Sequence, residues 1–253
     1  TLFRSAKGIK KIQRKIEKMY NSKTLQNADK VLVMNDFTKK LVNNYYSVSN
    51  NKISIVSNGT NLEKFYSHKK NNNRIIFSGA MYNHRGLDVL LNCASRVIDE
   101  INDVEFLLLG DGPEMVKLQE FVKKNNLSKN IIFKGWVERE EIPEFLASSS
   151  IGIGPLRITD VTKGALPIKI LEYMASSLPI LAMNETLPED ILKNEVNGYF
   201  IQDSRELAEK IIHILKNDDL RNQMSKNSNE MVQKFDWKYV AESIINEYQL
   251  IIS

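Results

Sequence analysis

Short apolar runs alternate with longer amphipathic segments along most of the chain, from about residue 74 onward. The short runs are continuous rather than alternating in polarity, which is typical of parallel strands covered on both faces. Their ranges are 74–79, 104–110, 130–136, 151–155, 179–183 and 198–201. In the segments between them, apolar positions recur at helical spacing. Alternating βα units of this kind predict an α/β fold built on a doubly wound parallel sheet.

The first part of the chain has a different pattern. Residues 7–20 place four apolar side chains on one stripe of a predicted helix, with lysines on its other faces. The run ADKVLVMN predicts a short buried strand, and Asn35 or Asp36 is the expected N-cap of the helix that follows it. A second strand, KISIVSNG, ends in an Asn-Gly turn. The polar run 67–74 is the predicted linker to the alternating region.

Charge is distributed unevenly between these two regions. The whole chain has a formal net charge of +4, but residues 1–73 carry +11 and the remainder carries −7. A shift of this size favours two regions with different roles. Together with the linker, it predicts a boundary between these regions near residues 67–74.

Composition excludes several protein classes. With 253 residues, 42% hydrophobic and 26% charged, the chain is expected to be globular rather than disordered. No apolar run reaches the length of a membrane span. The single cysteine, Cys93, lies inside a predicted helix and is interpreted as a small buried hydrophobe, which fits a reducing cytoplasm. Because the first residue is Thr1, we expect the sequence to be a fragment of a longer protein.

Candidate chemistry follows the strands, where a doubly wound sheet binds its ligands. Gly79 ends the first strand of the alternating region, and Arg85 and Gly86 precede the next helix. A glycine-containing turn into a helix N-terminus favours a phosphate, and an arginine adds a charge-assisted hydrogen bond. The alternative is a surface arginine in an ordinary turn. Gly110 and Asp111 follow the next strand, where a tight turn with Asp111 as N-cap is the alternative.

A carboxylate in an apolar helix is the most unusual feature of the chain. Within ALPIKILEYMASSLPILA, Pro167 is well placed for the first helical turn, and Glu172 lies deeper among apolar residues. A buried carboxylate needs a hydrogen-bond partner, and the vicinal hydroxyls of a sugar suit its two oxygens. A surface ion pair between Lys169 and Glu172 is the alternative.

The ordered set of motifs resembles retaining, nucleotide-sugar-dependent glycosyltransferases of family 4, which have the GT-B fold. The resemblance covers about 220 residues and rests on KISIVSNGTNLEKF, FSGAMYNHRGLDVLL, FLLLGDGPEMVKLQEF, IIFKGWVEREEIPEFLASSSIGIGP, PIKILEYMASSLPILAMNETLPEDI and VNGYFI. Each motif is loose, but their order and spacing are those of the family.

The resemblance implies roles for individual positions. Glu172 is similar to the second glutamate of the family's Glu-x7-Glu motif, which holds the ribose hydroxyls of the donor. Arg85 lies where the family has a basic residue beside the donor diphosphate, and Gly79 matches the glycine of the loop before it. The resemblance also implies that the amides around Ile168 and Lys169 lie near the phosphates, and that Gly135 and Trp136 line the nucleobase pocket. The candidate donor-binding set is completed by the strand-end and loop residues Gly86, Gly110, Asp111, Gly164 and Pro167.

Two positions depart from the family pattern. Gly164 stands where the first glutamate of the motif is expected, so a carboxylate that contacts the donor sugar is missing unless Asp160 takes its place. Ala80 replaces the arginine that commonly follows the first glycine, which removes one positive charge near the diphosphate.

The expected activity is metal-independent transfer of a hexose from a nucleotide sugar to a glycan or lipid-linked acceptor. No Asp-x-Asp metal site is present in the sequence, so no metal and no other cofactor is expected. Arg85, Lys169 and helix-terminal amides would then stabilise the departing diphosphate. A GT-B-fold epimerase or phosphorylase and a non-catalytic donor-binding fragment remain alternatives.

The resemblance also implies a division of roles. Residues 1–66 would be the end of an N-terminal acceptor domain, 67–235 the donor-binding domain, and 236–253 a helix crossing back toward the acceptor domain; local packing is the alternative for that helix. Such a fragment is expected to be inactive alone. The basic N-terminal helix is interpreted as a solvated lysine face, with peripheral contact to anionic lipid as the alternative for a cytoplasmic protein. Nucleic-acid binding is not expected.

Overall fold

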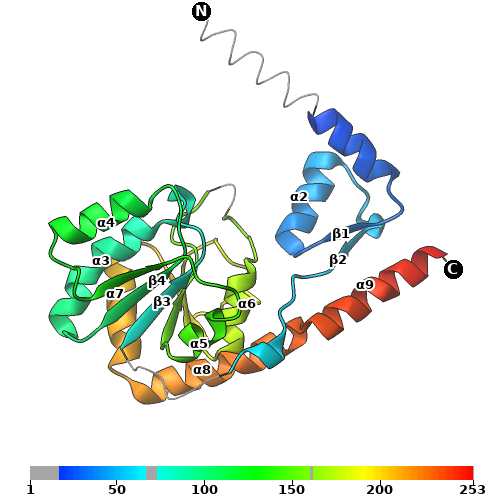
Figure 1. The fold of residues 1–253 in the computed structure, drawn as a ribbon. Coiled ribbons are helices and arrows are strands. Elements are labelled where there is room, and N and C mark those ends of the chain that lie inside the picture. The colour runs from blue at the N-terminus through cyan, green and yellow to red at the C-terminus, as the bar shows by residue number, and fades with distance from the viewer. Residues whose placement is uncertain (1–16, 67–72, 160–161, 253) are drawn as a thin grey trace, which may run out of the picture. The chain divides into compact units, whose positions relative to one another are not determined.

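The computed structural model describes residues 17–66, 73–159 and 162–252 (Figure 1). The chain divides into two compact units, which are considered separately below. The larger unit is Gly59–Trp237, and the smaller contains the residues before it together with Lys238–Ser253. The roles predicted for 1–66, 67–235 and 236–253 stay predictions. The predicted linker falls mostly outside the described residues, as does most of the N-terminal lysine-rich stripe.

The larger unit contains a six-stranded, fully parallel sheet in the order β5-β4-β3-β6-β7-β8. The strands are β3 (Arg74–Ser78), β4 (Glu105–Leu109), β5 (Ile131–Gly135), β6 (Ile151–Ile153), β7 (Ile180–Met183) and β8 (Gly198–Ile201). The doubly wound α/β sheet predicted from the continuous apolar runs is therefore confirmed. Apart from the edge strand β5, its strands are almost fully buried, as expected when helices cover both faces.

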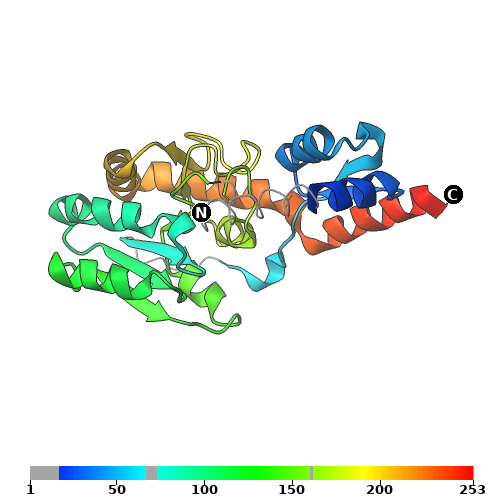
Figure 2. The ribbon, with the colours of Figure 1, turned by 90° about the horizontal axis from the view of Figure 1, so that it is seen from above.

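Helices pack on both faces of this sheet (Figures 1 and 2). One face is covered by α3 (Leu87–Glu100), α4 (Met115–Lys124) and α7 (Ser204–Leu215), whose apolar residues share a core with Phe77 and Phe106. The other is covered by α5 (Ile142–Ala147), α6 (Ile168–Ala175) and the end of α8 (Asp218–Val232), around Ile76 and Leu107. Adjacent strand residues thus face opposite cores.

Strand order places a topological switch point between β3 and β6. From β3 the chain winds outward through β4 to β5 and then returns to the other side of β3 with β6. Doubly wound sheets bind their ligands in the crevice at the carboxyl ends of the strands beside such a switch point.

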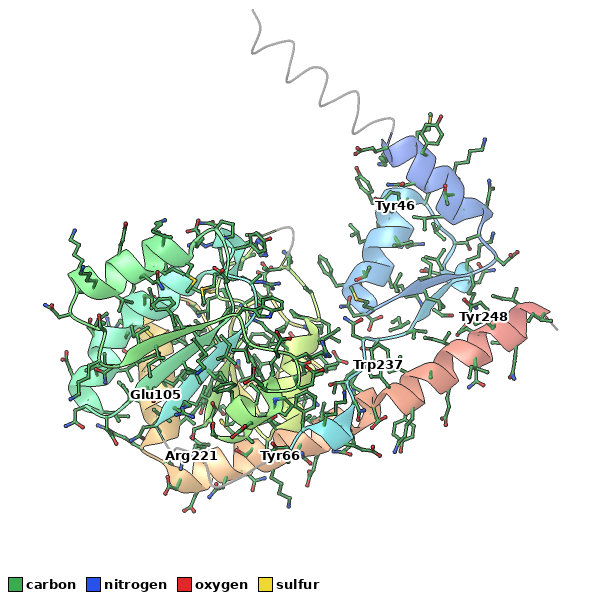
Figure 3. The ribbon with its side chains drawn as sticks, in the orientation of Figure 1. Tyr46, Tyr66, Glu105, Arg221, Trp237 and Tyr248 are labelled. Carbon is green, nitrogen blue, oxygen red and sulfur yellow. The ribbon has the colours of Figure 1, made fainter. Side chains whose placement is uncertain are left out.

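Two arginines join neighbouring elements of the larger unit, Arg74 between two strands and Arg221 between two helices. Arg74 pairs with Glu105 at the amino ends of β3 and β4, at 2.5 Å (Figure 3). Arg221, buried on α8, donates to the carbonyl of Leu215 and pairs with Asp218, so it satisfies orphan carbonyls at the end of α7 (Figure 3). Cys93 is buried in α3, and burial raises the pKa of its thiol to about 12, as expected for an inert core residue.

The smaller unit is a βαβ arrangement. A helix over residues 17–27 precedes β1 (Val31–Val33), and α2 (Asp36–Tyr46) connects β1 to its parallel neighbour β2 (Ile53–Ile55). Asn35 is the N-cap of α2, since its side chain accepts from the amide of Thr38. The helix α9 (Trp237–Ile252) ends the chain. No helix in residues 17–66, 73–159 and 162–252 is long and apolar enough to cross a membrane.

Candidate functional site

Three strand-end loops are joined by backbone hydrogen bonds at the carboxyl edge of the sheet. The amide of Gly79 donates to the carbonyl of Leu109 at 3.0 Å, and the amide of Gly110 donates to that of Gly135 at 2.7 Å. A Cβ on Gly110 would lie 2.3 Å from the carbonyl oxygen of Gly79, and the φ of Gly110 is +115°. The loops after β3, β4 and β5 can therefore approach this closely only with glycine at position 110.

The loop after β6 joins the same edge through Arg85 and Gly86. The amide of Leu156 donates to the carbonyl of Arg85 at 3.0 Å, which ties the two sides of the switch point together. Gly86 is the N-cap of α3 with φ +71°, and a Cβ there would meet the carbonyl carbon of Leu156 at 2.7 Å. The sequence therefore placed Arg85 and Gly86 correctly at the start of a helix beside the crevice.

The helix α6 begins at Ile168 on the opposite side of the crevice. Pro167 is its N-cap, with φ −66° and ψ 135°, so the predicted placement of Pro167 inside the first turn is one residue off. Its ring still removes an amide that the helix would leave unpaired. Gly164 lies in the preceding loop with φ +61°, and its amide donates to the carbonyl of Glu185. Asp160 lies outside the described residues.

Lys169, in the first turn of α6, extends its side chain across the end of β3. Its Nζ lies 3.7 Å from the centroid of the Phe77 ring, and it would lie 3.8 Å from a Cβ placed on Gly79. The ammonium thus lies directly beside Gly79, where a Cβ would be in ordinary van der Waals contact with it. Within the described residues, Nζ is buried and has no hydrogen-bond partner. Burial holds the pKa of Lys169 well below its usual value, and the positive charge of Arg85 lowers it further.

Arg85 is the second cation at this point of the crevice. Its Nε is buried and has no hydrogen-bond partner in the part of the chain that the structure describes. Burial lowers the pKa of the guanidinium, which remains charged at neutral pH because its ordinary pKa is so high. Arg85 and Lys169 thus each have a buried nitrogen without a hydrogen-bond partner in the described residues, which is costly, and an anion between the two would offset that cost.

Glu172 is buried on α6, with only 8% of its side chain exposed. Its Oε1 lies 3.4 Å from a guanidinium nitrogen of Arg139, in the loop between β5 and α5. Burial raises the pKa of Glu172, and Arg139 and then Lys169 act in the opposite direction. The alternative of a surface pair between Lys169 and Glu172 is wrong, because both charged groups are buried and no hydrogen bond joins them.

Arg139 is the residue that the sequence analysis missed. It is 33 residues from Glu172, inside a run of charged residues that reads as a solvated loop. No local periodicity connects the two positions, since their proximity depends on the packing of α6 beside the loop that follows β5. The one indication in the sequence was that a carboxylate buried at position 172 requires a hydrogen-bond or ion-pair partner, without showing which residue supplies it.

The remaining predicted positions lie at the ends of β4 and β5. Asp111 is exposed, and its Oδ1 accepts from the amide of Gly112 at 2.6 Å. It does not cap α4, whose N-cap is Glu114, so that alternative is wrong. Gly135 has φ +76° with no atom near the position of a Cβ, and the Trp136 beside it is 77% exposed. Their predicted contact with a nucleobase stays a prediction.

The site combines two cationic side chains, Arg85 and Lys169, with the carboxylate of Glu172 at the switch point of a parallel sheet. It suits a ligand with a polyanionic group and neighbouring hydroxyls. Across residues 17–66, 73–159 and 162–252, no three His, Cys, Asp or Glu side chains are grouped so that they could hold a metal ion.

Comparison with protein families gives a match over residues 59–231 to the family described as glycosyl transferases group 1. Among curated relatives, an uncharacterized glycosyltransferase of Methanocaldococcus jannaschii is 28% identical over 227 residues, which is 88% of this chain and 60% of that protein. The poly(ribitol-phosphate) alpha-N-acetylglucosaminyltransferase of Staphylococcus aureus is 23% identical over 88% of this chain and 44% of its own length. The chain thus spans about half the length of the curated relatives it matches.

Solved structures share the fold at low sequence identity. The S. aureus protein TarM, as a mutant in complex with fondaparinux, alpha-GlcNAc-glycerol and UDP, aligns with TM-score 0.77 at 20% identity, over 90% of this chain and 45% of that one. Anabaena HepE in complex with UDP-glucose aligns with TM-score 0.80 at 15% identity, over 92% of this chain and 67% of that one. Since the structural neighbours are GT-B glycosyltransferases, the larger unit has the Rossmann-like form of that fold.

Proposed function

The chain belongs to the glycosyl transferases group 1 family, and from this premise we propose that it binds a nucleoside-diphosphate sugar for transfer of the sugar to another molecule. Family membership supports the class of reaction. The details proposed here are the donor chemistry, the independence from metal and retention of configuration, the last of which follows from the resemblance to family 4.

The observation that carries the proposal is a pair of cationic side chains at the switch point, each with one buried nitrogen that has no hydrogen-bond partner among the described residues. Lys169 Nζ and Arg85 Nε lack hydrogen-bond partners within the described part of the chain. A diphosphate between them would supply acceptors to both, and the free amides at the start of α6 would add donors. The phosphates of UDP in complexes of the structural neighbours are groups of this kind.

Glu172 extends the proposed site toward the sugar of the nucleoside. Its carboxylate is buried and, within the described residues, has a single, mostly exposed partner, so it retains free acceptor capacity. The 2′ and 3′ hydroxyls of a ribose are vicinal donors that match its two oxygens. The nucleobase would then lie toward Gly135 and Trp136 at the end of the neighbouring edge strand.

The proposed mechanism is electrostatic. As the bond between the anomeric carbon and the diphosphate oxygen breaks, the electron pair leaves with the diphosphate, and Lys169 and Arg85 stabilise the added negative charge. An acceptor oxygen forms the new bond to the anomeric carbon and gives its proton to the departing diphosphate. In this scheme the two cations replace a divalent metal, and no cofactor is required.

The acceptor is proposed to be a glycan or a lipid-linked molecule. Relatives are described as acting on poly(ribitol-phosphate) and on phosphatidylinositol, and the chain covers only part of their length. Acceptor chemistry therefore belongs to the whole protein, and contact of the basic N-terminal region with anionic membrane stays a prediction that vesicle sedimentation would test.

Calorimetric titration of the chain with UDP, GDP and ADP, in the presence of EDTA, tests the donor site. We expect at least one of them to bind, and Lys169→Met to weaken that binding by about tenfold or more, since a charge-assisted hydrogen bond to phosphate is lost. Lys210→Met is the matched control, because Lys210 also lies over an aromatic ring, that of Tyr199, at 4.2 Å. Absence of binding by all three nucleotides, or binding only with Mg²⁺, would contradict the proposal.

A further inference from the structure

Arg139 is the one guanidinium within the described residues that forms an ion pair with Glu172. Its own side chain is 70% exposed, whereas that of Glu172 is 8% exposed. The carboxylate of Glu172 is therefore buried, and the guanidinium of Arg139 lies on its solvent-exposed side. A ligand hydroxyl that reached Glu172 would arrive from the side on which Arg139 lies.

The loop that carries Arg139 is fixed at both ends. The carbonyl of Gly135 accepts from the amide of Gly110, and the amide of Glu138 donates to the side chain of Glu141 at 3.2 Å. The helix α5 begins directly afterwards, with Pro143 in its first turn. Arg139 is therefore presented by a short, anchored loop that connects the strand end predicted to face the nucleobase to α5, and its guanidinium lies 3.4 Å from Glu172 on α6.

We propose that Arg139 is a positioning residue, whose guanidinium holds the carboxylate of Glu172 as the hydrogen-bond acceptor for vicinal hydroxyls of the ligand. This inference rests on the proposed function, because it assigns the hydroxyls to a nucleoside ribose. Arg139 itself acts through Glu172 and needs no contact with the ligand.

The electrostatic reason is the poor hydration of Glu172. A buried carboxylate tends to take up a proton, and a protonated carboxyl is a weaker acceptor for two hydroxyls. The groups that oppose protonation are Arg139, from the loop after β5, and Lys169, from α6 itself. The phenol of Tyr173 is the other neighbouring titratable group on α6. Lys169 is proposed to be engaged by the diphosphate, which leaves Arg139 as the cation free to act on the carboxylate.

The test compares UDP with 2′-deoxy-UDP, which lacks one of the vicinal hydroxyls. The ratio of their dissociation constants, measured between pH 5.5 and 8.5, isolates the hydroxyl contact. A change in the protonation of Lys169, or of His84 beside Arg85, should change the dissociation constants of both nucleotides by the same factor. It therefore cancels in their ratio. We expect the wild-type chain to prefer UDP over this whole pH range.

In Arg139→Gln we expect the preference for UDP to persist at pH 8.5 and to fall by up to about fivefold at pH 5.5, the size expected for an exposed ion pair. Arg139→Lys keeps the charge and should restore the wild-type profile. Arg96→Gln is the matched control, since Arg96 is a half-exposed arginine paired with a carboxylate, that of Glu209, at 3.7 Å. It should leave the ratio unchanged at every pH.

The outcomes separate the inference from the function on which it depends. If the wild-type chain binds no nucleotide at pH 8.5, the proposed function fails. If it binds UDP and the ratio in Arg139→Gln follows the wild-type profile, the role of Arg139 is refuted. A uniform loss of affinity for both nucleotides at every pH, or a gain in affinity, would also overturn it, because the first indicates general disruption and the second a guanidinium that blocks the site.

Discussion

The hydroxyl of Tyr173 accepts a hydrogen bond of 2.7 Å from the backbone amide of Ser78, 95 residues away in the sequence. This bond joins α6 to the last residue of β3, directly before Gly79. Both groups are buried. Lys169 and Glu172 lie on the same helix as Tyr173. The bond from Ser78 to Tyr173 therefore fixes the position of both side chains relative to the end of β3.

Replacing Tyr173 with phenylalanine should therefore lower stability and loosen the site. The amide of Ser78 would be left buried without a partner, which costs about 1–3 kcal/mol of unfolding free energy. Urea denaturation would measure the loss. Tyr199→Phe is the control, because Tyr199 is buried but its hydroxyl has no hydrogen bond within the described residues. Equal stability losses in the two variants would contradict a structural role for the Tyr173 hydroxyl.

Glu172→Gln should weaken nucleotide binding while leaving the fold as stable as the wild type or more so. Burial raises the pKa of Glu172, so ionising it in the folded chain costs more than in the unfolded chain. Glu172→Gln should thus be more stable to unfolding than the wild type at neutral pH. This difference should disappear below the ordinary carboxyl pKa of 4.5, where the wild-type side chain is also neutral. Melting temperatures between pH 4 and 8 would show it; a variant less stable at neutral pH would argue that the charge is well compensated.

At pH values above the lowered pKa of Lys169, binding of a nucleoside diphosphate should be accompanied by uptake of a proton at its amine. Burial and Arg85 lower the pKa of the ammonium in the empty site, whereas a bound diphosphate raises it again. Affinity for UDP should then fall as the pH rises through this lowered pKa. Calorimetry in buffers of different ionisation enthalpy would detect the proton uptake, which Lys169→Met should abolish. Equal heats in all buffers would show that Lys169 is already protonated in the empty site.

Two glycines at strand ends should differ strongly in their tolerance of alanine. At Gly110 the added Cβ would lie 2.3 Å from the Gly79 carbonyl oxygen, so we expect a loss of about 3 kcal/mol or more. At Gly135 the space is open and only the left-handed backbone opposes a side chain, so we expect about 1–2 kcal/mol. Denaturant unfolding of both variants measures the difference; similar losses would indicate that the loops after β3 and β4 move apart easily.

Much of the fold could be read from local patterns. Continuous apolar runs gave each strand of the larger unit to within about two residues, because burial on both faces leaves a direct mark in the composition of a strand. The positions of Arg85 and Gly86 at a helix start followed from glycine and helix-terminus chemistry. Asp111 as the N-cap of α4, the alternative considered for that residue, is wrong. The side chain of Asp111 accepts from the next amide in a turn, and the helix begins after Glu114.

By itself, the sequence determined the alternation of strands and helices, the edge of the sheet at which polar residues gather, and the conflict posed by a carboxylate in an apolar helix. These features are encoded by neighbours within a few residues of one another. Only the tertiary structure decided that Arg139 is the partner of Glu172, and that the Lys169 ammonium lies buried over Phe77 in the space beside Gly79. Such pairings depend on strand order and helix packing, which bring together residues that no local period connects.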